Sequence, residues 1–151
     1  MTSSLKIGAV SGLVAGFAAG IVFTISLRTS VSLGLYESSF PLLLVGQNAY
    51  GANILTGIIF GVICGVIYSR IYSVIPGKGI SKGFFFGLIL LLILWVRWAT
   101  FILAYGYYHM SAGGVFGGFF QWVAYGLVLG FLYEFLRSRR YPAREEPKII
   151  T

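Results

Sequence analysis

Residues 7–27 read IGAVSGLVAGFAAGIVFTISL, a stretch without a charged side chain in which a glycine stands at every fourth position from Gly8 to Gly20. At about 1.5 Å of rise per residue, a helix of this length crosses the roughly 30 Å hydrocarbon core of a bilayer. The stretch is longer than the apolar region of a secretory signal peptide, which has about 7–15 residues. We therefore expect a first transmembrane helix here.

Three further apolar runs follow, at about residues 53–72, 83–108 and 115–136, and the turn Pro76-Gly77-Lys78-Gly79 separates the first two of them. Only 10% of the residues are charged and 58% are hydrophobic, whereas a soluble domain has about 25% charged residues. The sequence therefore predicts an all-α integral membrane protein: a single four-helix transmembrane domain over residues 1–151, with a solvated tail at 139–151.

The basic residues are sorted by membrane side. Arg28 alone is expected on one side, and the other side holds Lys6, Arg70, Lys78, Lys82, Arg137, Arg139, Arg140, Arg144 and Lys148. By the positive-inside rule, we expect both termini of this multi-pass protein to face the cytoplasm. We expect the protein to lie in a prokaryotic plasma membrane. The net charge of +7 thus reflects topology, and we expect the lipid bilayer, not nucleic acid, as a partner.

The chain has the pattern of one helical hairpin used twice. The second run and the fourth share residue types at a constant offset, in the pairs Gly61/Gly126, Gly65/Gly130, Tyr68/Tyr133 and Ser73/Ser138. Gly8 and Gly12 correspond in the same way to Gly83 and Gly87. We expect two tandem hairpins, at about residues 5–75 and 81–138, related by a pseudo-twofold axis along the membrane normal.

Small residues spaced by four are the strongest local pattern, because a row of glycines on one helix face lets a second backbone approach closely. The expected packing glycines are Gly8, Gly12, Gly16, Gly20, Gly57, Gly61, Gly65, Gly126 and Gly130, with Gly114 and Gly118 continuing the last row. After Gly87 the third run is leucine-rich. We therefore expect the first, second and fourth helices to form the core and the third to be peripheral.

Arg97 is the main functional pointer, because it lies well inside the third run, where an unpaired charge costs at least about 2–3 kcal/mol. The acidic residues, Glu37, Glu134, Glu145 and Glu146, stand at other depths. The partners that we expect for Arg97 inside the chain are Trp95 and Trp98 through cation–π contacts, Gln121, tyrosine hydroxyls and backbone carbonyls. We expect Asn53 and Gln121 to bridge helices. Otherwise a carboxylate of another subunit, a lipid phosphate or an anionic substrate must neutralise it. Nearer the basic side, the spacing of Glu134 and Arg137 favours a local ion pair.

Residue types that commonly catalyse reactions or bind metals and cofactors are scarce in this sequence. Cys64 and His109 are the sole cysteine and histidine, so the chain offers neither an internal disulfide nor a bis-histidine haem site. Ring proteolipids of rotary ATPases, which have similar hairpins, need a carboxylate at mid-membrane in the last helix, where this chain reads Val123-Ala124-Tyr125-Gly126-Leu127. We expect no cofactor, no metal and no catalysis.

Two functions remain open at this point. One is a non-catalytic accessory subunit of a larger membrane complex, for example a respiratory or redox assembly. It is favoured by the glycine faces and by an arginine without an internal acid. The other is a small-solute or ion channel or transporter that works as a homo-oligomer, with Arg97, Asn53, Gln121 and the tyrosines along its path.

Overall fold

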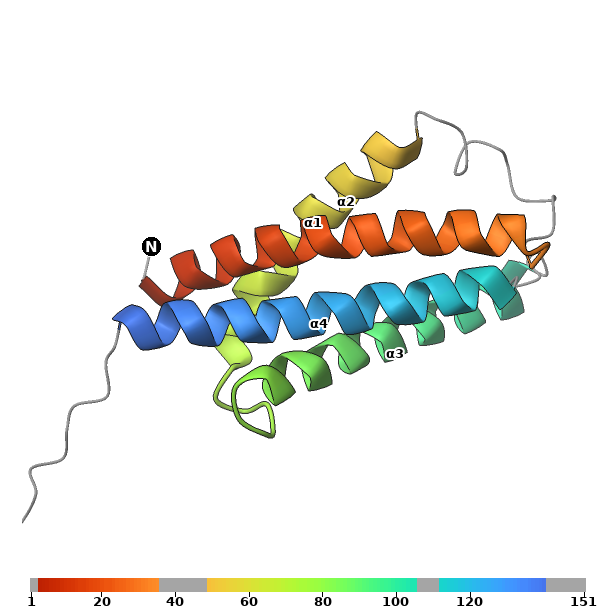
Figure 1. Cartoon of the computed structure of the whole chain (residues 1–151). Helices are drawn as coiled ribbons and strands as arrows, with labels where there is room; N and C mark the ends of the chain where they lie inside the picture. Colours follow the sequence, from red (N-terminus) through yellow and green to blue (C-terminus); the bar gives the residue numbers. More distant parts are fainter. Residues whose placement is uncertain (1–2, 36–48, 106–111, 141–151) are drawn as a thin grey trace, which may run out of the picture.

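The computed structural model describes residues 3–35, 49–105 and 112–140. It contains four helices: α1 (Ser3–Ser32), α2 (Ala49–Ile71), α3 (Ile80–Tyr105) and α4 (Ala112–Arg140). Each is long and apolar enough to cross a membrane. The predicted all-helical, multi-pass class is therefore confirmed, and Figure 1 shows the helices as one elongated bundle.

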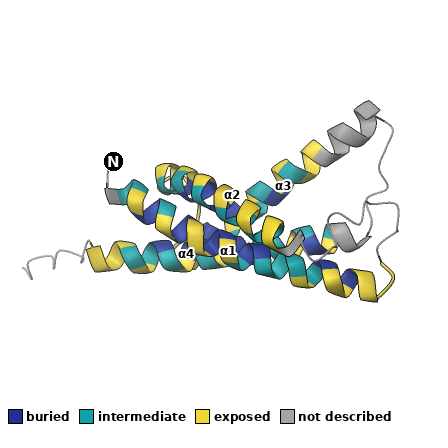
Figure 2. Ribbon diagram, turned by 90° about the horizontal axis from the view of Figure 1, so that it is seen from above, coloured by how far each residue is buried: buried dark blue, intermediate teal, exposed yellow. Residues whose placement is uncertain are grey.

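The centre of the bundle is the pair α1 and α4. The main contacts join α1 to α2, α1 to α4 and α3 to α4, and in Figure 1 α2 crosses behind this central pair. Within the spanning segments, 39% of α1 is buried but only 22% of α2 and 22% of α3, and buried residues follow α1 in Figure 2. α2 nevertheless makes its main contact with α1 and adds the buried Cys64 and Tyr68 to the core, and α3 packs mainly on α4, in agreement with the expectation of a peripheral third helix.

Glycines let the backbones of α1 and α2 touch. A Cβ at Gly12 would lie 2.2 Å from the carbonyl oxygen of Gly61, and one at Gly16 would lie 2.2 Å from that of Gly57. No real side chain fits at such distances. Added Cβ atoms would meet backbone atoms of the partner helix within 3 Å at Gly8, Gly20, Gly57, Gly61 and Gly65 as well. The helices therefore associate through dispersion contacts between backbones.

The same kind of glycine contact recurs between α3 and α4, but it extends over fewer residues. A Cβ at Gly83 would lie 2.2 Å from the carbonyl oxygen of Gly126, and one at Gly87 would lie 2.5 Å from that of Trp122. The next position on this helix face, four residues after Gly87, is Leu91 and not a glycine. The close backbone contact between α3 and α4 therefore ends there. Gly118 has nothing within 4 Å of an added Cβ. It is therefore outside the packed row in which we expected it.

The helix ends meet at what we call the basic end of the bundle, where the N-terminus, the α2–α3 turn and the end of α4 lie together in Figure 1. Tyr68 of α2 is fully buried there. Its ring centroid lies 5.2 Å from that of Phe86 and 5.2 Å from that of Tyr133. These rings connect α2 to α3 and α4 at this end.

Tyr72 contacts three charged residues at the basic end. Its hydroxyl donates a hydrogen bond to the carboxylate of Glu134, and the Arg137 guanidinium lies 4.8 Å from its ring centroid. Lys82 donates a 2.7 Å hydrogen bond to its carbonyl oxygen. Glu134 and Arg137, which we expected to pair with each other, thus both contact Tyr72. The sequence pattern did not predict this longer-range partner.

Candidate anion site in a lateral cavity

A cavity of about 410 Å³ lies between α2 and α3, in the part of the bundle away from the basic end. Each helix contributes one face to it. From α2 come Asn53, Thr56, Gly57, Phe60, Gly61 and Cys64; from α3 come Leu90, Ile93, Leu94 and Arg97; from α4 come Gln121, Trp122 and Tyr125; and from α1 come Ala19 and Phe23. It exists because α2 packs on α1 and α3 packs on α4, so that α2 and α3 diverge beyond the basic end.

The lining is polar at one end and apolar at the other. α2 runs toward the basic end, so Asn53 stands farther from that end than Cys64, by about 16 Å at 1.5 Å per residue. α3 runs the opposite way, which places Arg97 about 10 Å farther from the basic end than Leu90. The charged and amide groups therefore lie toward the far end, with rings such as that of Trp122 among them. The end nearer the basic end, which we call the deep end, holds Cys64, Leu90 and Tyr125.

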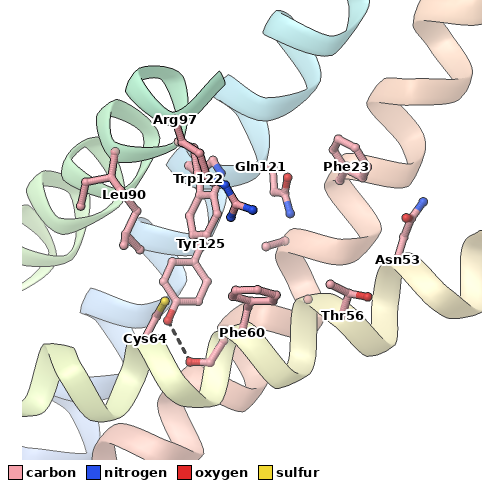
Figure 3. A pocket seen from close by; sticks show the side chains of 15 residues that line it. Phe23, Asn53, Thr56, Phe60, Cys64, Leu90, Arg97, Gln121, Trp122 and Tyr125 are labelled. Carbon is pink, nitrogen blue, oxygen red and sulfur yellow. Dashed lines mark hydrogen bonds between the residues drawn. The ribbon is translucent and has the colours of Figure 1, made fainter. Parts of the chain in front are cut away.

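Arg97 reaches into this cavity. Figure 3 shows its guanidinium directed into the space beside Trp122 and Gln121, as expected from helix side chains that lean toward the N-terminus of their helix. The residue is exposed, and within the described part of the chain no hydrogen bond or ion pair engages it. The guanidinium therefore faces the cavity with hydrogen-bond donors that no described group engages.

Two amides accompany the arginine. The side chain of Gln121 lies on the wall next to Arg97 in Figure 3. The side-chain nitrogen of Asn53 is buried and has no hydrogen-bond partner among the described groups. The structure thus brings together, in one cavity, three residues that the sequence analysis selected separately. Among the described lining residues none is acidic, and Arg97 is the charged one.

The two tryptophans expected beside Arg97 are placed differently. Trp95 is partly exposed and does not line the cavity, because residues two apart on a helix point to different faces. The side chain of Trp98 lies outside the described residues, as do Glu37, His109, Glu145 and Glu146. The aromatic wall comes from Trp122 of α4 instead.

A hydrogen bond closes the deep end. The hydroxyl of Tyr125 donates to the carbonyl oxygen of Gly61 over 2.9 Å, and Tyr125 is only 1% exposed. The ring of Trp122 packs edge-on against that of Tyr125, with centroids 5.6 Å apart. This bond ties α4 to α2 and makes a floor under the cavity, where Cys64 is also buried.

A periodic signal in the sequence could have found the residues that we missed. The cavity residues of α2 follow the spacing of one helix face, in steps of three and four from Asn53 to Cys64. Those of α3 follow the same spacing from Leu90 to Arg97. Projecting from the two polar residues along their helix faces would therefore have identified Thr56, Phe60, Ile93 and Leu94.

Among the described residues, no group of three or more His, Cys, Asp or Glu side chains gathers at a possible metal site. Comparison of the chain with protein-family models, with curated proteins and with solved structures finds no match. The argument for function therefore depends on the cavity itself, which combines one cation, two amides and an apolar floor within a membrane-type bundle.

Proposed function

We propose that this protein binds a small anionic molecule in the cavity between α2 and α3, as a non-catalytic component of solute handling in the membrane. A single observation carries the proposal. The guanidinium of Arg97 projects into a cavity that is also lined by the side chain of Gln121. Both groups can donate hydrogen bonds to an anion.

The size and the surroundings of the cavity support a small ligand. A volume of about 410 Å³ falls within the range of roughly 300–1,000 Å³ that is usual for small-molecule sites. A guanidinium holds a carboxylate or a phosphate through two parallel hydrogen bonds. In a water-poor setting that pairing gains strength, and it removes the cost of an unpaired charge at membrane depth.

Reconstituted vesicles test the proposal. We expect the wild-type protein to carry an anionic solute across the membrane, and the Arg97→Ala variant to lose this flux. Arg70→Ala is the matched control, because Arg70 is an exposed arginine at the basic end of α2 and does not line the cavity. Flux that is absent from wild-type vesicles, or is unchanged by Arg97→Ala, would contradict a role in solute handling.

An accessory subunit of a larger complex, such as a respiratory or redox assembly, is the second candidate. Its support is the small buried share of the outer helices, 22% in the spanning segments of α2 and of α3, which leaves two apolar faces for another membrane subunit. A carboxylate of that subunit would then neutralise Arg97. Purification in a mild detergent tests this, since the candidate requires a co-purifying subunit that Arg97→Ala releases and Arg70→Ala retains.

We propose in addition that the basic end faces the cytoplasm of a prokaryotic cell and that both termini lie there. The positive-inside rule supports this orientation. A thiol introduced by Ser73→Cys in a Cys64→Ser background should then react with a membrane-impermeant maleimide only after the cells are opened. A thiol at Ser32→Cys, at the other end, should react in intact cells. The reverse labelling pattern would invert the topology.

Equivalent contacts in the two halves support the proposed duplication. Gly8 approaches Gly65 in the first hairpin, and Gly83, the counterpart of Gly8, approaches Gly130, the counterpart of Gly65, in the second. Tyr68 and its counterpart Tyr133 touch each other, with ring centroids 5.2 Å apart. The α1–α4 contact has no counterpart of similar extent between α2 and α3 in the described residues, so these contacts support a repeated hairpin and not an exact pseudo-twofold axis between the two copies.

A further inference from the structure

We infer that the ligand of this cavity is a single-chain amphiphile with a monoanionic head group, of which a long-chain carboxylate is the simplest example. The head group binds at Arg97 and Gln121, and the chain extends toward Cys64 and Tyr125. This inference rests on the proposed anion-binding function and adds to it the chemical class of the ligand and its orientation.

The order of polarity along the cavity carries the orientation. Arg97 and Gln121 stand at the far end, whereas the deep end is made of Leu90, Cys64 and the floor at Tyr125. An amphiphile in the adjoining leaflet has the same order, with its head toward the membrane surface and its chain toward the midplane. It can therefore enter the cavity without turning over.

The volume fits one chain. At roughly 30 Å³ for each group of the size of water or methylene, a cavity of about 410 Å³ holds on the order of a dozen such groups. One acyl chain of about this length with a small head group fills this space, and the rest of a longer chain, such as that of stearate, would extend through the open side into the bilayer. The cavity has no room for a second chain, so its volume corresponds to a single-chain ligand.

The charge of the lining fits one negative charge. Of the cavity residues that the structure describes, Arg97 is the charged one, and Asn53 and Gln121 add neutral amides. A carboxylate is neutralised by one guanidinium through two hydrogen bonds. A phosphate monoester carries about −1.5 to −2 charges at neutral pH, so part of its charge would stay uncompensated in a medium of low dielectric constant.

The cavity is open on its side. Phe60 of α2 and Ile93 of α3 both line it, yet their side chains are 55% and 58% exposed. Large apolar side chains that are exposed on a membrane-type helix bundle face acyl chains. The mouth between α2 and α3 therefore opens to the bilayer, which is the phase that holds a long-chain carboxylate.

Fluorescence quenching tests this inference on the purified full chain in detergent micelles. The Trp95→Phe/Trp98→Phe variant keeps Trp122, which lines the cavity, as its single tryptophan. The Trp122→Phe/Trp98→Phe variant keeps Trp95, which lies outside it, and serves as the control. The probe is stearate brominated at mid-chain. We expect saturable quenching of Trp122 and only gradual, unsaturable quenching of Trp95.

Substitution of the arginine tests the head group. In the variant that keeps Trp122, Arg97→Gln should raise the probe concentration needed for half-quenching about tenfold or more, since a hydrogen bond to a charged group is lost. Arg97→Lys should restore part of the affinity. Circular dichroism and a single elution peak show that each variant is folded.

The possible outcomes separate this inference from the proposed function. Trp122 quenching that never saturates overturns the inference, and the flux assay then decides the proposed function alone. Equal half-quenching concentrations for the brominated carboxylate and the matching brominated alcohol overturn both, because the anion is then irrelevant. If acetate displaces the probe at concentrations as low as oleate does, the anion site stands and the chain-binding part of the inference is wrong.

Discussion

Replacing Gly12 by alanine puts a methyl carbon where the backbone of α2 already lies. The new Cβ would stand 2.2 Å from the carbonyl oxygen of Gly61, and ordinary contact begins at 3.4 Å. The difference of 1.2 Å must come from separation of the two helices, because the obstructing atom is backbone and has no rotamer to change. We expect the Gly12→Ala variant to be substantially less stable than the wild type.

The magnitude follows from the atoms that separate. A gap of 0.5–1 Å forfeits about a quarter to a half of the dispersion energy of each affected atom pair, and the α1–α2 contact extends from Gly8 to Gly20. In soluble cores, one extra methylene in a filled space costs about 1–3 kcal/mol. Because the whole contact row is displaced, we expect a loss of about 2–3 kcal/mol in the free energy of unfolding. At about 2–4 °C per kcal/mol for a chain of this size, the melting temperature should fall by about 4–12 °C.

Gly118→Ala is the matched control for this experiment. Gly118 is a helical glycine of α4, and a Cβ there meets nothing within 4 Å. The substitution should be neutral or stabilise by up to about 1 kcal/mol, since alanine favours the helix. Thermal unfolding of both variants, followed by circular dichroism in one detergent, measures the difference. If Gly12→Ala melts at the same temperature as Gly118→Ala, direct backbone contact does not hold α1 on α2.

Two further substitutions test the bonds that join the hairpins. Tyr125→Phe removes the buried hydrogen bond to Gly61, and thermal melts should show a loss of about 0.5–1.5 kcal/mol; an unchanged melting temperature would show that this bond is dispensable. Burial and the hydrogen bond to Glu134 raise the pKa of the Tyr72 phenol above its ordinary value of about 10. Because the folded state holds this proton more tightly, the stability contribution is fully present below pH 10 and is lost as the pH rises through the raised pKa. Melting temperatures between pH 9 and 12 should therefore fall less steeply for Tyr72→Phe than for the wild type, and parallel curves would contradict this assignment.

The candidate site was only partly visible in the sequence. Arg97, Asn53 and Gln121 stood out because each is polar within an apolar run, and that reasoning needs no fold. Their neighbours did not stand out, because Phe60, Ile93 and Trp122 are ordinary residues of membrane helices. Only the packing of the helices shows that these side chains share one cavity. The expected tryptophan partners of Arg97 illustrate the same limit, because proximity in sequence placed Trp95 near the arginine but on another face.

The sequence by itself determined that this is a membrane protein of four helices, since long apolar runs have no other stable placement. It also indicated most of the glycines at which backbones meet, although Gly118 lies outside the packed row. The tertiary structure alone decided the order of packing, with α1 and α4 at the centre and α2 and α3 diverging. The physical reason is the length of each glycine face: four contacts reach from Gly8 to Gly20 along α1, whereas α3 has only Gly83 and Gly87 before bulky side chains begin. Where that short face ends, α3 leaves the bundle and the cavity beside Arg97 opens.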